Sequence, residues 1–320
     1  MQDNRIKQFM NKFAVPIILL LFIILIQVIY PDKPLLTWEN LKNIFIQSAI
    51  LGFISLGLSI ILICGEIDMS FAGSIGLIGT TFSYALLSGT CPLVAVLIAL
   101  CVGLMVWCSF TLLVAKYKFS SIIVSICLMF VCMGGERLYN DGKTIWIKDT
   151  SIKSLATMEI FGMPLLVVVL IVAYCIFYFV INQTKFGFKA RVVGENEKAA
   201  LEVGMSPQNV KVFAFLLAFL MYIAGSIIEP IRVGGSQIYA GNRYLLPAMA
   251  ASFLGSSMFY PGRINLMGTF VGSLFMGFIL NFLTILGIRF YFVPLTQGIL
   301  LLVGVGIATA RNRSIKQIKL

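Results

Sequence analysis

The chain alternates between long apolar segments and short polar stretches, and this alternation constrains its fold more than any other feature. A helix needs about 17–25 predominantly apolar residues to cross the hydrocarbon core of a bilayer. About ten segments of the sequence approach this requirement. The chain is 59% hydrophobic and only 12% charged, whereas a soluble domain is about half apolar and about a quarter charged. We therefore predict an all-α polytopic membrane protein.

The polar residues between the apolar segments define ten expected spans and leave no stretch for a second folded domain, so 1–320 is predicted to be a single transmembrane domain. The first span follows a basic N-terminal stretch, but it is too long for a signal peptide and no small-residue cleavage site follows it. The expected spans are 13–30, 41–64, 71–87, a fourth that follows 88–92 and ends at 115, 120–134, 164–181, 212–228, 245–258, 264–286 and 291–310.

The distribution of lysine and arginine predicts the orientation of these spans. Positively charged residues concentrate in the cytoplasmic loops of membrane proteins. Most of the 24 lysine and arginine residues fall on one side if both termini are cytoplasmic. The net charge of +11 is explained by this bias, so it does not indicate a nucleic-acid partner. We predict that the lipid bilayer surrounds the chain and that both termini lie in the cytoplasm.

The longest polar interruption in the second half of the chain is 185–211, on the predicted cytoplasmic side. Its pattern predicts one short helix, about Asn196–Val203, with acidic residues at its start, where they suit the helix dipole. Gly204 occupies the expected C′ position, and Ser206-Pro207 begins the next helix. A helix of about eight residues is marginal in water. We therefore expect it to be ordered by docking onto another surface.

Two acidic residues, Glu66 and Asp68, interrupt the apolar sequence between the second and third spans. Acidic residues are costly in hydrocarbon and usually face a cavity, a partner or water. Gly65 and Ser70, which flank them, would permit a broken helix or a tight turn. The segment Gly65–Ser70 is therefore either a short polar turn or part of a gate or translocation path, and both interpretations stay open.

Two rows of small residues have the spacing of a helix face. Such rows allow helices to approach closely and form weak hydrogen bonds. Ordinary helix packing is favoured over a pore lining for both. The residues are Gly73, Gly76, Thr80 and Ser83 in the third span, and Gly268 and Gly272 in the ninth.

The sequence provides no combination of residues typical of an enzyme. Gly142-Lys143-Thr144 resembles the end of a phosphate-binding loop, but Arg137 stands where that motif requires glycine, and no strand precedes it. The chain has no histidine, so a conventional zinc or haem site is not expected. We predict no catalytic residue, no metal site and no cofactor in this chain.

Two loops are expected on the outer side, 136–163 and 229–244, each with near-balanced charge. They carry Tyr139, Trp146 and Tyr239, which we expect to be exposed. These loops either bind a soluble extracytoplasmic partner through salt-sensitive contacts or are solvated connectors. The sequence leaves both alternatives open.

Three motifs carry a resemblance to a known family. The sequence GENEKAALEVGM at 194–205 resembles the cytoplasmic coupling loop of ABC-importer permeases, and most closely the ribose/monosaccharide branch of the branched-chain amino acid/sugar permease-like family. Gly65–Ser70 is similar to the G-x-I-D-L-S segment of that branch. Leu254–Gly277 resembles its Gly-rich region, although Ser256, Met258, Phe259 and Tyr260 are larger than usual there. The matching residues of that region are Gly262, Arg263, Gly268, Thr269 and Gly272.

The resemblance implies the permease subunit of an ATP-driven sugar importer in the bacterial inner membrane. It implies two permease copies, identical or paralogous, an extracytoplasmic sugar-binding protein, and two cytoplasmic ABC ATPases that bind ATP and Mg. We assign ATPase coupling to Gly194, Glu195, Asn196, Ala199, Ala200, Val203 and Gly204, with Ala199, Ala200 and Val203 as the apolar docking face. The residues assigned to gating or the pathway are Gly65, Glu66, Asp68, Ser70, Gly262, Arg263, Gly268 and Gly272.

A second class of protein competes with this interpretation. An ion-coupled secondary transporter could use Glu66 or Asp68 as its coupling acid, which would explain acidic residues at membrane depth. It would not explain a short cytoplasmic docking helix. An importer and an ion-coupled transporter are therefore both retained, and the importer is favoured.

Overall fold

The computed structural model describes residues 2–160, 162–260, 262–289 and 291–317. These residues are mostly helical and fall into two compact units. Unit 1 comprises Met1–Ser55 and Leu246–Leu320, and unit 2 comprises Leu56–Leu245. The helix α2 begins in unit 1 and continues into unit 2, and α11 begins in unit 2 and continues into unit 1.

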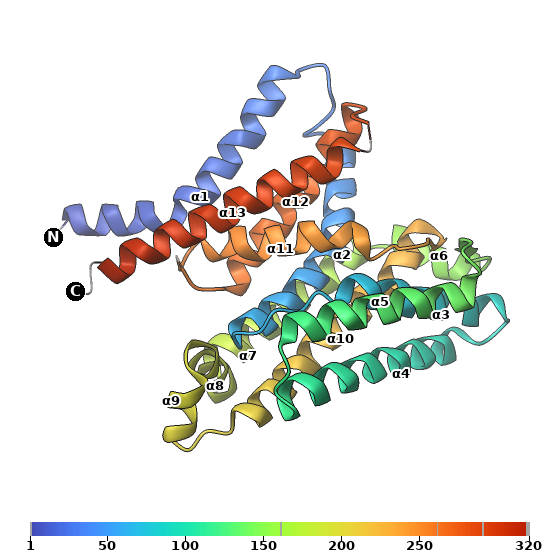
Figure 1. The fold of residues 1–320 in the computed structure, drawn as a ribbon. Coiled ribbons are helices and arrows are strands. Elements are labelled where there is room, and N and C mark those ends of the chain that lie inside the picture. Colours follow the sequence, from blue (N-terminus) through green and yellow to red (C-terminus); the bar gives the residue numbers. More distant parts are fainter. Residues whose placement is uncertain (1, 161, 261, 290, 318–320) are drawn as a thin grey trace. The chain divides into compact units, whose positions relative to one another are not determined.

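Unit 1 is built from helices of the two ends of the chain (Figure 1). Asn40 and Asn281 are buried and exchange two amide hydrogen bonds of 3.1 and 3.0 Å, which join α2 to α12. The helices with residues in this unit are α1 (Gln2–Ile29), α2 (Trp38–Ile63), α11 (Asn242–Ser256), α12 (Leu266–Ile285) and α13 (Phe292–Gln317).

The small residues of α12 pack against α11, as the sequence predicted. A Cβ atom at Gly268 would collide with the carbonyl oxygen of Gly255, and one at Gly272 would collide with the carbonyl oxygen of Ala251. The two backbones can therefore approach this closely only because both positions lack a side chain. This geometry favours helix packing over a pore lining for Gly268 and Gly272.

Unit 2 is organised around α3, which packs against α4, α5 and α10 (Figure 1). An aromatic cluster fills part of its core, where the ring centroids of Phe110 and Phe215 lie 5.0 Å apart and those of Phe71 and Tyr222 lie 5.5 Å apart. Its helices, besides the ends of α2 and α11, are α3 (Phe71–Leu87), α4 (Pro92–Thr111), the π-helix η1 (Leu112–Lys116), α5 (Ser121–Asn140), α6 (Thr150–Thr157), α7 (Leu165–Gln183), α8 (Lys185–Glu195), α9 (Glu197–Glu202) and α10 (Pro207–Val233).

Four two-residue strands organise the loops that the sequence placed on the outer side. β1 (Ile145–Trp146) pairs antiparallel with β4 (Gly235–Ser236), so the two loops are joined to each other. β2 (Glu159–Ile160) pairs with β3 (Met163–Pro164). Trp146 is 58% exposed and Tyr139 is 45% exposed, as expected, whereas Tyr239 is half-buried and its ring lies 4.7 Å from the Arg137 guanidinium.

The start of each outer loop was predicted incorrectly, because α5 and α10 extend further than the sequence indicated. Glu136 lies within α5 and Glu229 lies within α10, and both are buried. Charge alone suggested that these helices ended before the glutamates. A buried glutamate remains compatible with a helix where the surrounding protein supplies polar partners.

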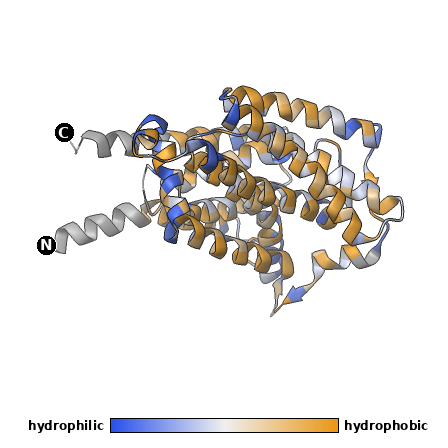
Figure 2. Ribbon diagram, turned by 90° about the horizontal axis from the view of Figure 1, so that it is seen from below, coloured by the Kyte–Doolittle hydropathy of each residue, from blue (hydrophilic) through white to orange (hydrophobic). Residues whose placement is uncertain are grey.

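Six helices of the described chain are long and apolar enough to cross a membrane: α2, α4 with η1, α5, α7, α10 and α12. Three shorter apolar helices or helix segments lie at 13–29, 71–87 and 292–306. The third predicted span coincides with α3 at both ends. Figure 2 shows hydrophobic residues along the helices of both units. The chain is thus a polytopic helical membrane protein, whereas a count of ten spans stays a prediction.

Candidate functional site

The polar stretch 185–211 forms two helices and the start of a third, rather than the single short helix that the sequence predicted. Lys185–Glu195 is helical throughout (α8), and small residues at positions 187, 190 and 193 face the protein with helical spacing. Asn196 then adopts an extended conformation, with φ −161° and ψ 103°. That small-residue spacing was the available signal for α8, and it was obscured by the charged residues between.

Both ends of α9 are capped, and the glycine at its C-terminal end is the one that the sequence predicted. The Ala199 backbone N–H donates to Asn196 Oδ1 at 3.1 Å, so Asn196 is the N-cap. Gly204 has φ +75° and follows the helix as its C′ residue. The Gly204 N–H donates to the Leu201 carbonyl and the Met205 N–H donates to the Ala200 carbonyl, both at 3.0 Å. These are the two bonds of a Schellman motif.

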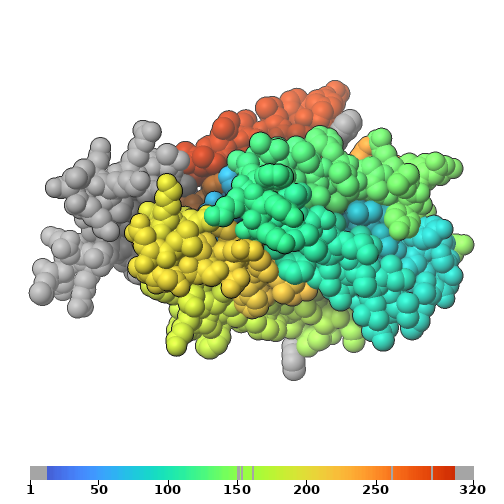
Figure 3. Space-filling model, turned by 60° about the horizontal axis from the view of Figure 1, so that its bottom comes forward, coloured from blue at the N-terminus to red at the C-terminus, as the bar shows by residue number. Residues whose placement is uncertain are grey.

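The two faces of α9 differ from the predicted docking face. Ala200 is completely buried within its own chain, whereas Val203 is 67% exposed. Leu201, which was not assigned, is 52% exposed. The outward apolar surface of α9 is therefore formed by Leu201 and Val203, and Ala200 anchors the helix inward. The sequence of so short a helix does not show which side the rest of the chain covers. Figure 3 shows α8 and α9, in yellow, forming part of the surface of unit 2 beside α10.

The segment Gly65–Ser70 lies directly against the end of α8. Gly65 has φ +79°, and a Cβ atom there would lie 2.9 Å from the carbonyl oxygen of Gly194. A Cβ atom at Gly194 would collide with the carbonyl oxygen of Ile63. Two motifs that are far apart in the sequence therefore touch backbone to backbone, and both contacts require glycine.

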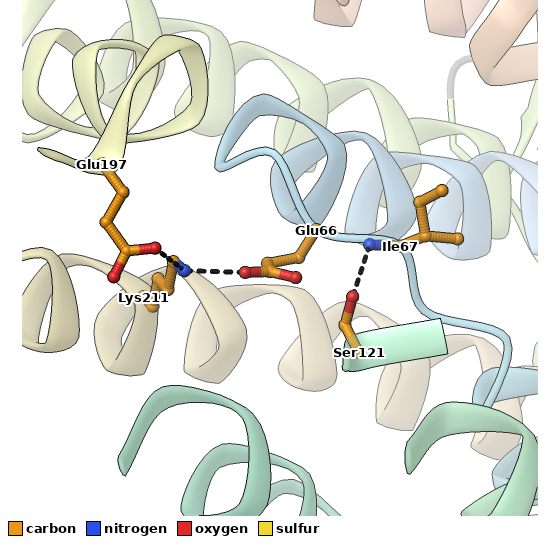
Figure 4. A network of polar contacts seen from close by, with 5 residues as sticks. All are labelled: Glu66, Ile67, Ser121, Glu197 and Lys211. Atoms are coloured by element: carbon orange, nitrogen blue, oxygen red, sulfur yellow. Dashed lines mark hydrogen bonds and ion pairs between the residues drawn. The ribbon is translucent and has the colours of Figure 1, made fainter. Parts of the chain in front are cut away.

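A lysine that was not predicted as a site residue connects these two motifs. Lys211 Nζ lies 2.7 Å from Glu66 Oε1 and 2.7 Å from Glu197 Oε2 (Figure 4). Lys211 is only 7% exposed, and the Glu66 and Glu197 side chains are 19% and 38% exposed. Lys211 comes from the second turn of α10, Glu197 from α9 and Glu66 from the α2–α3 loop. In the sequence this lysine was indistinguishable from the other basic residues of the loop.

The neighbours of Glu66 extend the same network into α5 and α3. The Ile67 N–H donates to Ser121 Oγ at 3.3 Å, which ties the loop to the first residue of α5 (Figure 4). Asp68 Oδ1 accepts a 2.7 Å hydrogen bond from the Ser70 N–H just before α3. Burial removes Asp68 from water and raises the pKa of its carboxyl to about 6. Glu66 and Asp68, alike in the sequence, therefore have different environments, since Glu66 is ion-paired and Asp68 is desolvated.

The third motif lies in unit 1 and forms the connection between α11 and α12. Gly262 has φ +85°, and its N–H donates to the Ser256 carbonyl at 3.0 Å. Asn265 Oδ1 accepts from the Gly268 N–H at 2.7 Å and caps α12. Arg263 is exposed. The geometry of this motif is that of a tight, capped connection between two closely packed helices.

The apparent phosphate-binding sequence is a turn. Gly142 has φ +72° and follows α5, a helix and not a strand, and β1 comes after it. A phosphate-binding loop of this type connects a strand to a helix that follows it. The rejection of Gly142-Lys143-Thr144 as a nucleotide site is consistent with this arrangement.

Comparison with known proteins identifies the family. The family model described as "Branched-chain amino acid transport system / permease component" matches residues 40–305. The chain belongs to this permease family. The matched residues of the permease include the Lys211 network, α9 and the α11–α12 connection. The resemblance inferred from the three motifs is thus confirmed.

The relatives of the permease are similar along nearly their whole length. The ribose import permease protein of Bacillus subtilis (strain 168) is 29% identical over 300 residues, covering 92% of each chain. The ribose import permease protein of Haemophilus influenzae is 27% identical over 295 residues, covering 90% of each. An L-arabinose ABC transporter permease protein of Azospirillum brasilense is 23% identical, covering 93% of this chain and 87% of the relative. No solved structure matches the permease.

Proposed function

We propose that this permease is the membrane-spanning subunit of an ATP-driven importer of a monosaccharide, ribose or a related sugar. The observation that carries the proposal is the similarity to ribose import permeases over 92% of both chains. A match of this extent covers the spans and the polar loops together. The pairing of Glu66 with Lys211 also disfavours Glu66 as the free coupling acid of a secondary transporter.

The proposed complex places this chain in the bacterial inner membrane with both termini in the cytoplasm. A second permease, identical or paralogous, completes the translocation pathway, and an extracytoplasmic binding protein delivers the sugar. ATP and Mg bind to separate cytoplasmic ATPase subunits, and this chain contributes no catalytic residue. The ATPase docks at α9, on the outward surface of Leu201 and Val203 and on the exposed residues Glu195 and Asn196.

The proposal is tested by reconstituting the permease in lipid vesicles with and without its co-purifying partners. We expect ATP-dependent accumulation of radiolabelled ribose or arabinose only with an ATPase and a binding protein present. The permease alone should neither hydrolyse ATP nor accumulate sugar. Sugar uptake by the permease alone, driven by an ion gradient, would instead establish a secondary transporter.

The docking surface is tested with a pair of leucine variants. Leu201→Ser should reduce co-purification of the ATPase by about tenfold if Leu201 is one of the few anchor residues that carry most of the binding energy of an interface, each of which contributes more than about 1 kcal/mol. Leu138→Ser is the matched control, because Leu138 lies on α5 and is 89% exposed. Equal retention of the ATPase by both variants would move the docking site away from α9.

A further inference from the structure

We infer that Lys211 is a positioning residue that transmits movement of α9 to the Gly65–Ser70 loop, and through that loop to α3 and α5. This inference rests on the proposed function, since it concerns how a motion driven by the ATPase reaches the membrane-spanning helices. It assigns a role to a buried lysine that lies outside the three family motifs.

The first argument is the position of the lysine. One ammonium group, at 2.7 Å from each of two carboxylates, joins α10, α9 and the α2–α3 loop. These distances are typical of charge-assisted hydrogen bonds, which are stronger than those between neutral groups. The lysine is 7% exposed, so losing both partners would leave a charge that water stabilises poorly. The three elements therefore move together as long as both ion pairs of Lys211 are intact.

The second argument is that the bridge acts beside a rigid backbone contact. Gly65 and Gly194 touch through their main chains next to Glu66, so α8 and the loop cannot approach further. This backbone contact resists only closer approach, so movement of α9 away from the loop is opposed by the two ion pairs of the lysine. A packed contact of this kind is either kept or lost and does not deform continuously.

The third argument is the continuation of the network on the far side of the loop. Ile67 N–H bonds to Ser121 at the start of α5, and Asp68 bonds to the Ser70 N–H at the start of α3. The α3 helix is buried along most of its length and packs against α4, α5 and α10. A shift of the loop therefore reaches the centre of unit 2 through contiguous bonds.

The two ion pairs of Lys211, called here the Glu66 arm and the Glu197 arm, differ in exposure to water. We therefore expect them to contribute differently to coupling. The Glu66 side chain is 19% exposed and the Glu197 side chain is 38% exposed. Water can replace the Glu197 arm more easily, so this arm can break and re-form as α9 moves. The Glu66 arm keeps Lys211 attached to the loop. We expect Glu66→Gln to impair coupling more than Glu197→Gln.

The experiment uses the whole transport complex in vesicles and measures ribose imported for each ATP hydrolysed. Lys211→Met should retain the ATPase subunit and its ATP hydrolysis but import about tenfold less ribose per ATP, a typical size for coupling between sites. Lys211→Arg, which restores the charge, should recover part of the loss. Lys189→Met, at an exposed lysine of α8, should equal the wild type.

Hydrogen exchange supplies a readout that a merely structural lysine would not change in the same way. Binding of a non-hydrolysable ATP analogue to the wild-type complex should alter exchange in α9 and at 65–70. In Lys211→Met the response should remain in α9 and disappear at 65–70. If Lys211→Met does not insert into the membrane, Glu197→Gln is the test variant, because it preserves the Lys211–Glu66 pair.

The outcomes separate this inference from the proposed function. A wild-type complex that contains no ATPase or imports no ribose or arabinose contradicts the proposed function. A wild-type complex that imports sugar, with unchanged coupling in Lys211→Met and an exchange response that still reaches 65–70, overturns the role of Lys211 alone. Equal loss of ATP hydrolysis and import, with faster exchange at 65–70 regardless of nucleotide, reduces Lys211 to a structural residue.

Discussion

The two ends of α10 take part in polar junctions of different kinds. At its start lies the inner junction, formed by Glu66, Glu197 and Lys211, in which charged side chains from three elements meet. Towards its end lies the outer junction, defined as Thr80, Glu136, Glu229, Ser236, Tyr239 and Arg243, in which Glu229 Oε1 of α10 lies 3.6 Å from Arg243 Nη2. There the Tyr239 N–H donates to Glu136 Oε1 at 3.1 Å, and the Thr80 and Ser236 hydroxyls lie 2.8 Å apart.

Burial explains why the polar contacts of the two junctions differ in how easily they can rearrange. In the outer junction Glu136 is 0% exposed, and Glu229 and Ser236 are each 1% exposed. Gly76 leaves the space that the Glu136 carboxylate occupies, so the small-residue row of α3 serves this polar contact as well as helix packing. In the inner junction Glu197 remains partly exposed. Bonds exchanged with water are easier to rearrange than fully buried ones. The inner junction is therefore suited to movement, and the outer one to holding β4 in place.

The largest loss of stability is expected from a substitution at the backbone contact between Gly194 and the end of α2, beside the inner junction. Gly194→Ala places a methyl group against the Ile63 carbonyl, which only a backbone shift can relieve. We expect a loss of about 3 kcal/mol or more, at the upper end for overpacking, measured as a fall in the thermal unfolding midpoint in detergent. Gly134→Ala is the control, because a Cβ atom there meets nothing within 4 Å. A Gly194→Ala protein as stable as this control would show that the two motifs are not in contact.

A smaller effect on the free energy of unfolding, on the order of 1–3 kcal/mol, is expected from Asp68, the desolvated acid next to the inner junction. Its pKa is raised from 3.8 to about 6 by burial, so the folded protein binds this proton more tightly than the unfolded chain. This contribution to stability is complete below pH 3.8 and is lost as the pH rises through about 6. Asp68→Asn keeps an oxygen that can accept the Ser70 N–H but cannot ionise.

The measurement is the unfolding midpoint of the wild type minus that of Asp68→Asn, followed from about pH 4 to pH 7. The difference should become less favourable to the wild type as the pH rises. A constant difference over this range would mean that Asp68 titrates as an exposed carboxyl does, and that it is hydrated in the folded protein.

The smallest loss of stability is expected from breaking the contact between the Thr80 and Ser236 hydroxyls in the outer junction. Thr80→Val removes one hydroxyl and leaves the buried Ser236 hydroxyl without this partner, which should cost about 1 kcal/mol. The double variant Thr80→Val/Ser236→Ala should recover part of that loss, because removing both partners is less costly than removing one. Import per ATP should be unchanged in both variants. A loss of coupling here as large as in Lys211→Met would remove the distinction between the two junctions.

The sequence predicted features that depend on local chemistry. Gly204 was correctly placed after α9, and Ser206, whose side chain accepts from the Asn209 N–H, was correctly placed as the N-cap of α10, because capping depends on groups within a few residues. The third span matched α3 from Phe71 to Leu87, since hydrophobicity and a glycine-containing polar loop define it locally. The family was also recognisable from three motifs. The docking role of α9, by contrast, remains a prediction, because it concerns a partner chain.

Prediction failed where the environment of a residue depends on distant segments. Glu136 was assigned to a loop, yet the space at Gly76 and the Tyr239 N–H make it a buried helix residue. Ala200 was assigned to an outward face, yet it is buried against the rest of its own chain. Lys211 was only one of several basic residues until folding brought Glu66 and Glu197 to it.

The sequence by itself determined the membrane class of this protein, the approximate position of its long apolar helices, the caps at Gly204 and Ser206, and its family, because each follows from composition or from neighbouring residues. Only the tertiary structure decided which acid is paired and which is desolvated, although Glu66 and Asp68 are two residues apart. Electrostatic environment is set by whatever charge or apolar group lies within a few ångströms in space. For Glu66 that neighbour is 145 positions away in the chain.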